Sequence, residues 1–80
     1  MTTVIVINLT PDGAEPMGSR SLFRLPHKGD WIEIEDENGQ AFCCEVCQVL
    51  IGPYGADVFV TNPTPTANAR LKLAERYGRR

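Results

Sequence analysis

The segment from Leu25 to Val49 constrains the fold of this 80-residue chain more than any other part of the sequence. Residues 31–35 (WIEIE) alternate between apolar and charged side chains, which is the period of a strand with one buried face. Asn38-Gly39 supplies the positive φ that a tight hairpin loop needs. The runs on either side of this turn are therefore predicted to form two antiparallel strands.

The loop of this hairpin determines its register. A three-residue loop over residues 37–39, with Gly39 in the left-handed region, sets apolar residues opposite one another. A slip of one residue would turn these side chains toward solvent. Beyond the hairpin the apolar spacing changes, which predicts a β-bulge near Cys47-Gln48. The predicted cross-strand pairs are Asp36 with Gln40, Ile34 with Phe42, Ile32 with Cys44, and Asp30 with Val46.

The flanking segments predict further strands. Residues 2–9 are β-branched and apolar on both faces, which indicates a strand covered on both sides or lying at an oligomer interface. Residues 11–21 (PDGAEPMGSRS) predict a loop, and residues 22–25 predict a short strand ended by Pro26. A turn over residues 52–55 leads into a strand at residues 58–60.

The last part of the chain predicts a helix. Thr64 is a suitable N-cap, Pro65 suits the first helical position, and Gly78 suits the end. Ala67, Leu71 and Ala74 form one apolar stripe at helical spacing.

The strand entry at residues 26–32 (PHKGDWI), the Asn-Gly turn and the bulged apolar strand resemble small SH3-like β-barrels. Uncharacterised bacterial and phage proteins of this type open a barrel strand with Pro-x-x-Gly-Asp-x-Ile. The resemblance covers residues 22–61 and implies at most a binding or adaptor module. The expected fold is mainly β: a small SH3-like barrel or bent antiparallel sheet over residues 1–63, with one C-terminal α-helix over residues 64–80 packed on the same domain.

Charge and composition narrow the functional classes. Residues 1–65 contain three basic and nine acidic side chains, whereas residues 66–80 contain five basic side chains and one acidic side chain. The acidic body would repel phosphate groups, which opposes general nucleic-acid binding. The longest apolar run, residues 4–7, is far shorter than the roughly 20 residues that span a bilayer. Three cysteines, an odd number, suit a reducing compartment, so a cytoplasmic location without membrane association is expected.

The cysteines include one C-x-x-C match, Cys44 to Cys47. Zinc requires ligands that converge on one ion, but residues i and i+3 of a strand point to opposite faces. We therefore expect structural cysteines, with Cys44 in the core and no cofactor. A zinc site is the alternative, and its ligands would be Cys43, Cys44, Cys47 and His27. His27 could also act as a general base oriented by Asp30, although a turn histidine is the simpler interpretation.

Trp31 and Phe59 are predicted to lie on the outer face of the sheet, where they could form a binding patch. The C-terminal helix could instead cover them through Leu71, Leu73 and Tyr77. The favoured function is a non-enzymatic interaction module that binds a protein partner or self-associates as a homodimer through residues 4–9 or the helix. The alternative is nucleic-acid binding, with stacking on Trp31 or Tyr54 and basic contacts from Arg70, Lys72, Arg76, Arg79 and Arg80.

Overall fold

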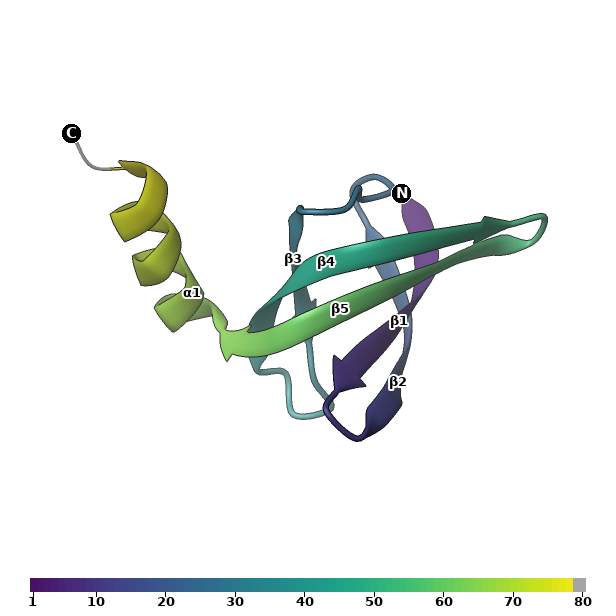
Figure 1. Ribbon diagram of the computed structural model, residues 1–80, viewed down its shortest axis with the longest axis horizontal. Coiled ribbons are helices and arrows are strands. Elements are labelled where there is room, and N and C mark those ends of the chain that lie inside the picture. Colours follow the sequence, from purple (N-terminus) through teal and green to yellow (C-terminus); the bar gives the residue numbers. More distant parts are fainter. Residues whose placement is uncertain (79–80) are drawn as a thin grey trace.

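Figure 1 shows the computed structural model, which describes residues 1–78 as a curled sheet of five strands followed by a short helix. This architecture confirms the predicted fold class, a mainly β bent sheet with one C-terminal helix. The elements in chain order are β1 (Thr2–Thr10), β2 (Gly13–Leu22), β3 (Trp31–Glu35), β4 (Ala41–Gly52), β5 (Gly55–Pro65), α1 (Thr66–Leu73) and a π-helical segment, η1 (Ala74–Gly78).

The strands are arranged in the order β2-β1-β5-β4-β3 and curl into a half-barrel. All neighbouring pairs are antiparallel except β1 and β5, which run parallel with Ile5 beside Asp57. β1 therefore occupies the interior of the sheet, and β2 and β3 form its two edges. Since both edges of β1 are paired, the predicted interface through residues 4–9 could use only its outer face. Ile5 on that face is 42% exposed, so the expected cover on both sides of β1 is wrong.

The core lies on the concave face of the half-barrel. The side chains alternate along each strand, so every second one points inward and contributes to this core. Asn8 is the buried polar residue at the end of this face, and its amide donates to Glu15 Oε1 at 3.4 Å. The buried apolar side chains are Val4, Val6, Ile34, Cys44, Val46, Val58 and Val60, so the predicted core position of Cys44 is confirmed.

The predicted register of the β3–β4 hairpin is also confirmed, and Ile34 pairs with Phe42 and Ile32 with Cys44. Gly39 adopts a φ of 81°, in the left-handed region. Asp36 stabilises this loop, because its Oδ1 accepts hydrogen bonds of 2.9 Å from the main-chain N–H groups of residues 38 and 40. The predicted bulge is present as a register shift between Val46 and Gln48.

The prediction of a loop over residues 11–21 is wrong, because residues 13–22 form β2. The predicted strand over residues 22–25 is also wrong, since β2 ends at Leu22. Two residues that resemble strand breakers are accommodated here. Pro16 lies on an edge strand, where a missing N–H is tolerated. Gly18, with a φ of 88°, lies beside a bulge at Met17, where the register with β1 shifts.

The helix begins two residues later than predicted. β5 continues to Pro65, α1 starts at Thr66, and the Thr64 hydroxyl donates to the Asn62 carbonyl instead of capping the helix. Leu71 of the predicted apolar stripe is 64% exposed, whereas Ala69 is buried. The predicted stripe is wrong, because α1 turns the face that contains Ala69 toward the sheet and leaves Leu71 exposed. The predictions for the Tyr77 side chain and for Arg79 and Arg80 lie outside the described residues.

One contact ties the start of α1 to the sheet. The Thr66 hydroxyl donates to Glu33 Oε2 at 2.9 Å and lies 3.7 Å from Cys43 Sγ. Neither helical segment within residues 1–78 has the length and apolar character needed to cross a bilayer.

β4 and β5 extend well beyond the rest of the sheet. β3 pairs with β4 only over residues 41–45, and β1 pairs with β5 only over residues 57–60. Residues 49–56 therefore form a two-stranded hairpin that projects from the half-barrel, here called the apolar arm. The arm and α1 lie at opposite ends of the long axis of the molecule, which measures 43 Å (Figure 1).

Candidate interaction surfaces

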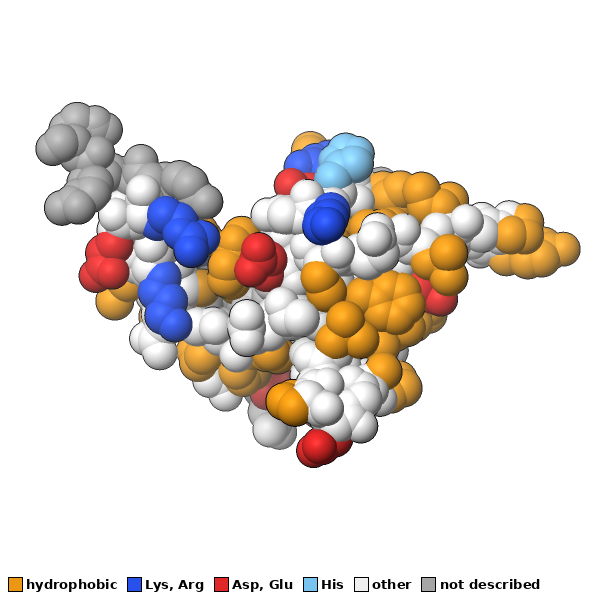
Figure 2. Space-filling view, in the orientation of Figure 1, with side chains coloured by type: hydrophobic (Ala, Val, Ile, Leu, Met, Phe, Trp, Pro, Cys, Tyr) orange, Lys and Arg blue, Asp and Glu red, His pale blue; other side chains and the backbone are white. Residues whose placement is uncertain are grey.

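The apolar arm exposes large hydrophobic side chains to solvent. Leu50 is 60% exposed, Ile51 is 68% exposed and Tyr54, at the tip, is fully exposed. Figure 2 shows hydrophobic side chains at this tip, at the opposite end from the basic side chains of the helix. Tyr54 is among the binding residues predicted from the sequence, whereas Leu50 and Ile51 are not. Residues 46–56 contain no charged side chain, but this run alone does not distinguish an exposed arm from a core strand.

A hollow of about 470 Å³ lies at the base of the arm, between the arm and the start of β1. Apolar side chains from both elements line it, among them Ile5, Leu50, Pro53, Tyr54 and Ala56. The arm thus combines a projecting apolar tip with an adjacent apolar depression. Such contiguous exposed apolar surface commonly marks a protein-binding site.

Trp31 is half-buried at the other end of the molecule. It pairs with Glu45 and lines a hollow of about 660 Å³ between the sheet and the helical segments. Lys72, Leu73 and Arg76 line the same hollow, so α1 and η1 form a wall beside the indole.

The structure does not bring Trp31 and Phe59 into one patch. Phe59 is half-buried on the outer face of β5, next to Ile7 of β1 and Gln48 of β4. It does not line the hollow that contains Trp31, as far as the described residues define it. The predicted pair of aromatics is therefore split between two parts of the sheet.

The residues predicted to bind nucleic acid are only partly brought together. Lys72 and Arg76 lie beside Trp31, but Glu45 and Glu75 line the same hollow and offset their charge. Tyr54 lies at the tip of the arm, at the far end of the molecule from the helix. Of the residues predicted to bind nucleic acid, Trp31, Lys72 and Arg76 line one hollow together.

The three cysteines occupy separate environments. Cys44 is fully buried, the Cys47 thiol donates to the Phe59 carbonyl at 3.2 Å, and Cys43 lies beside Thr66. Within residues 1–78, no group of three or more His, Cys, Asp and Glu side chains is placed to hold a metal ion. Burial raises the pKa of the Cys44 thiol from 9.0 to about 11, with a smaller contribution from the neighbouring Cys43.

We expect Cys44 to resist alkylation in the native protein, because it is both buried and protonated at neutral pH. Iodoacetamide at pH 8, followed by peptide mass spectrometry, should label Cys43 and Cys47 before Cys44. In urea all three should react. Since the native pKa is raised, the contribution of Cys44 to stability is complete below pH 9.0 and is lost as the pH rises toward about 11. Rapid native labelling of Cys44 would contradict its core position.

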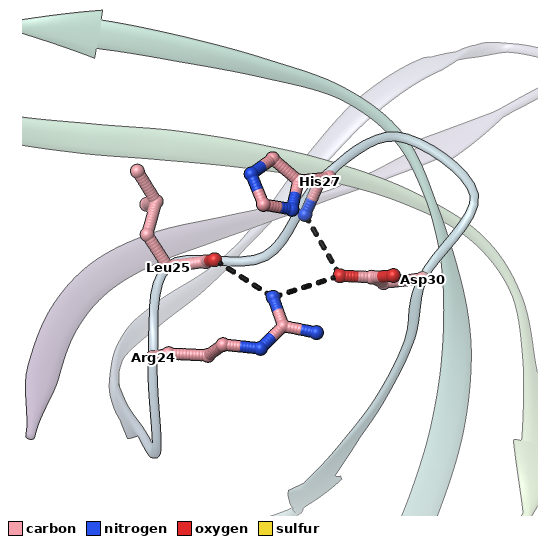
Figure 3. A network of polar contacts seen from close by, with 4 residues as sticks. All are labelled: Arg24, Leu25, His27 and Asp30. Atoms are coloured by element: carbon pink, nitrogen blue, oxygen red, sulfur yellow. Dashed lines mark hydrogen bonds and ion pairs between the residues drawn. The ribbon is translucent and has the colours of Figure 1, made fainter.

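Asp30 organises the loop between β2 and β3 (Figure 3). Its Oδ2 accepts the main-chain N–H of His27 at 2.9 Å and pairs with Arg24 Nη1 at 3.1 Å, and the same Nη1 donates to the Leu25 carbonyl. The imidazole of His27 takes no part in this network. The main-chain N–H of His27, and secondarily the Arg24 guanidinium, hold the pKa of the Asp30 carboxyl below its ordinary value of 3.8. The geometry makes Asp30 a loop anchor for the start of β3.

Because the pKa of Asp30 is lowered on folding, its contribution to stability is present above pH 3.8 and is lost as the pH falls through the native value. The Asp30→Asn variant should therefore lose less stability than the wild type when the pH is lowered from 5 to 3. Asp12→Asn, in the exposed β1–β2 turn, makes the same charge change and serves as the control. Urea midpoints at each pH give the measurement. Parallel acid responses of the wild type and Asp30→Asn would show that Asp30 is not linked to folding.

No family model, curated protein or solved structure matches the chain in sequence or fold.

Proposed function

We propose that this protein is a small, non-enzymatic interaction module that self-associates through the apolar arm. The observation that carries the proposal is the exposure of Leu50, Ile51 and Tyr54 on a hairpin that projects from the sheet. A two-stranded hairpin is marginally stable in water on its own. A partner that covers the arm would stabilise it and would remove its apolar surface from solvent.

The charge distribution favours a second copy of the chain as that partner. Residues 1–65 carry nine acidic and three basic side chains, so the bodies of two copies repel one another where their charged faces meet. Residues 46–56 contain no charged side chain, and the arm is therefore where two copies can approach without this cost. In a twofold arrangement, the arm of one copy would lie against the hollow beside Ile5 of the other copy.

Light scattering across a dilution series tests this proposal directly. The expected result is the mass of a dimer at high concentration and a shift toward the 8.9 kDa monomer on dilution. Added salt should leave the dimer intact or strengthen it, because the contact is apolar. A monomer mass at every concentration would remove self-association as the function of the arm.

Single-stranded nucleic-acid binding is the second candidate function, and it rests on the hollow beside Trp31. Bases stack on aromatic rings and basic side chains attract the backbone, which would assign Trp31 and Lys72 these two roles. Fluorescence anisotropy with a labelled oligothymidylate at low ionic strength tests the idea. Binding should weaken steeply with salt and should be lost in Lys72→Glu. Absence of any salt-sensitive binding would exclude this function.

A further inference from the structure

A groove separates the two edge strands of the half-barrel. Within residues 1–78, β2 and β3 do not pair with each other. Two adjoining hollows, of about 360 and 610 Å³, run between them and share the lining residues Ser21, Leu22 and Glu33. Together they follow β3 from Trp31 to Glu35 and continue into the hairpin loop.

The register of β3 indicates which backbone groups face this groove. Val46 donates to the Asp30 carbonyl, and the Asp36 N–H donates to Gln40, so the even-numbered residues of this strand bond to β4. In an antiparallel pair the intervening residues point their N–H and C=O groups to the other side. The free edge therefore presents the backbone of Trp31, Glu33 and Glu35. In agreement, the Glu35 carbonyl accepts a hydrogen bond of 3.1 Å from Arg20 Nη2 across the groove.

The Arg20 side chain connects the two edge strands, β2 and β3, which do not pair with each other within residues 1–78. Arg20 pairs with Val4 of β1, whose side chain is in the core, so Arg20 starts from the inner face of β2. Its guanidinium also donates to the Ser19 carbonyl at 3.0 Å. The aliphatic part of the side chain covers the opening and the charged end satisfies one carbonyl of the β3 edge. Arg20 therefore spans the groove between β2 and β3 at the end near Glu35.

The floor and the rim of the groove differ in chemistry. The floor is apolar, because the half-buried Leu22 and Ile32 pack against the core there. The rim is acidic on the β3 side, where β3 and the following loop carry four carboxylates, and it carries the cation Arg20 on the β2 side. The four carboxylates are Glu33, Glu35, Asp36 and Glu37. Two of them, Glu33 and Asp36, also accept hydrogen bonds within the protein.

We propose that this groove binds an extended peptide segment with alternating basic and apolar residues, which adds to the free edge of β3 as a further strand. The main chain of the peptide would pair with the backbone groups of Trp31 and Glu33. Its apolar side chains would cover Leu22 and Ile32, and its lysine or arginine side chains would lie beside the acidic rim. Strand addition of this kind takes its affinity from main-chain bonds and its specificity from alternate side chains.

A second copy of this chain is a poor occupant of the groove. If two β3 edges paired, Glu33 and Glu35 would face the same carboxylates of the other copy, and like charges directly opposite each other destabilise a sheet. The inference is independent of the self-association proposed for the apolar arm. Substitutions in the arm should leave it unchanged.

The test uses the whole protein and a nine-residue peptide of alternating lysine and valine. We expect saturable binding by isothermal titration, and slower amide exchange at Trp31, Glu33 and Glu35 in two-dimensional NMR spectra of the complex. A peptide with N-methyl groups on the main chain of two adjacent residues, one lysine and one valine, keeps the charge but loses a donor to β3 in either strand orientation, and it should bind at least about tenfold more weakly. An alternating glutamate and valine peptide should not bind.

Two protein variants locate the contact. Glu35→Lys, on the rim, should weaken binding of the lysine peptide by about tenfold or more, whereas Glu75→Lys, on η1, makes the same charge change and should alter it by less than about twofold. Equal binding of the N-methylated peptide would reduce the interaction to general charge attraction and overturn the proposal. Equal effects of the two variants, no binding, or a peptide-free dimer with protected β3 amides would overturn it as well.

Discussion

Replacing Ile34 with alanine is expected to lower the free energy of unfolding by about 3 kcal/mol. Ile34 is 4% exposed and contributes to the core from the centre of the β3–β4 hairpin. The loss combines the transfer free energy of the removed methyl and methylene groups with the cavity they leave. A domain of about this size has little stability to spare, so the variant should be partly unfolded at physiological temperature.

Ile51→Ala provides the matched control, because it removes the same atoms from a side chain that is 68% exposed. It should change the free energy of unfolding of the monomer by less than about 0.5 kcal/mol. Urea unfolding followed by Trp31 fluorescence gives both midpoints, measured at a concentration where the protein is monomeric. If Ile51→Ala is as destabilising as Ile34→Ala, the assignment of the core to the concave face is wrong.

Replacing Leu50 and Ile51 together with aspartate is expected to raise the dissociation constant of the proposed dimer by at least about 100-fold. Burial of each side chain contributes about 1.5 kcal/mol or more, and 1.4 kcal/mol corresponds to a factor of ten. The fold should survive, since both side chains are exposed in the monomer. Sedimentation equilibrium measures the change in association, and circular dichroism checks the sheet.

Phe23→Asp separates a specific contact from general hydrophobicity. Phe23 is 91% exposed but lies in the loop after β2, not in the arm. Its replacement should change the dissociation constant by less than about threefold. A similar loss of association in Phe23→Asp would indicate non-specific adhesion, and an unchanged dimer in the arm variant would move the interface to another face.

The parts of the fold that could be predicted from the sequence are those determined by neighbouring residues. The alternation of residues 31–35 and the position of Gly39 define one register for the β3–β4 hairpin, and the structure has that register. The same register places Cys44 in the core. The alternation of side chains along a strand explains why Cys47 lies apart from it. These are local patterns with one consistent solution.

The parts that could not be predicted depend on where an element lies in the sheet. Pro16 and Gly18 argue against a strand unless that strand is known to be an edge with a bulge. The side of α1 that is buried depends on how the chain leaves β5, which the composition of an eight-residue helix does not specify. The exposure of the apolar arm could not be predicted for a similar reason. An uncharged apolar run also suits a core strand, and only the neighbouring strands of the sheet distinguish the two.

The parallel pairing of β1 with β5 has a consequence for the order in which the chain folds. Ile5 pairs with Asp57, and Asn8 pairs with Val60, so the two residues of each pair are 52 positions apart in the sequence. Such distant contacts carry a large loop-closure cost and slow folding. During synthesis, β1 and β2 would leave the ribosome before the strands that cover the apolar face of β1. The half-barrel could close only after β5 had been made, and until then the apolar face of β1 would stay open to solvent.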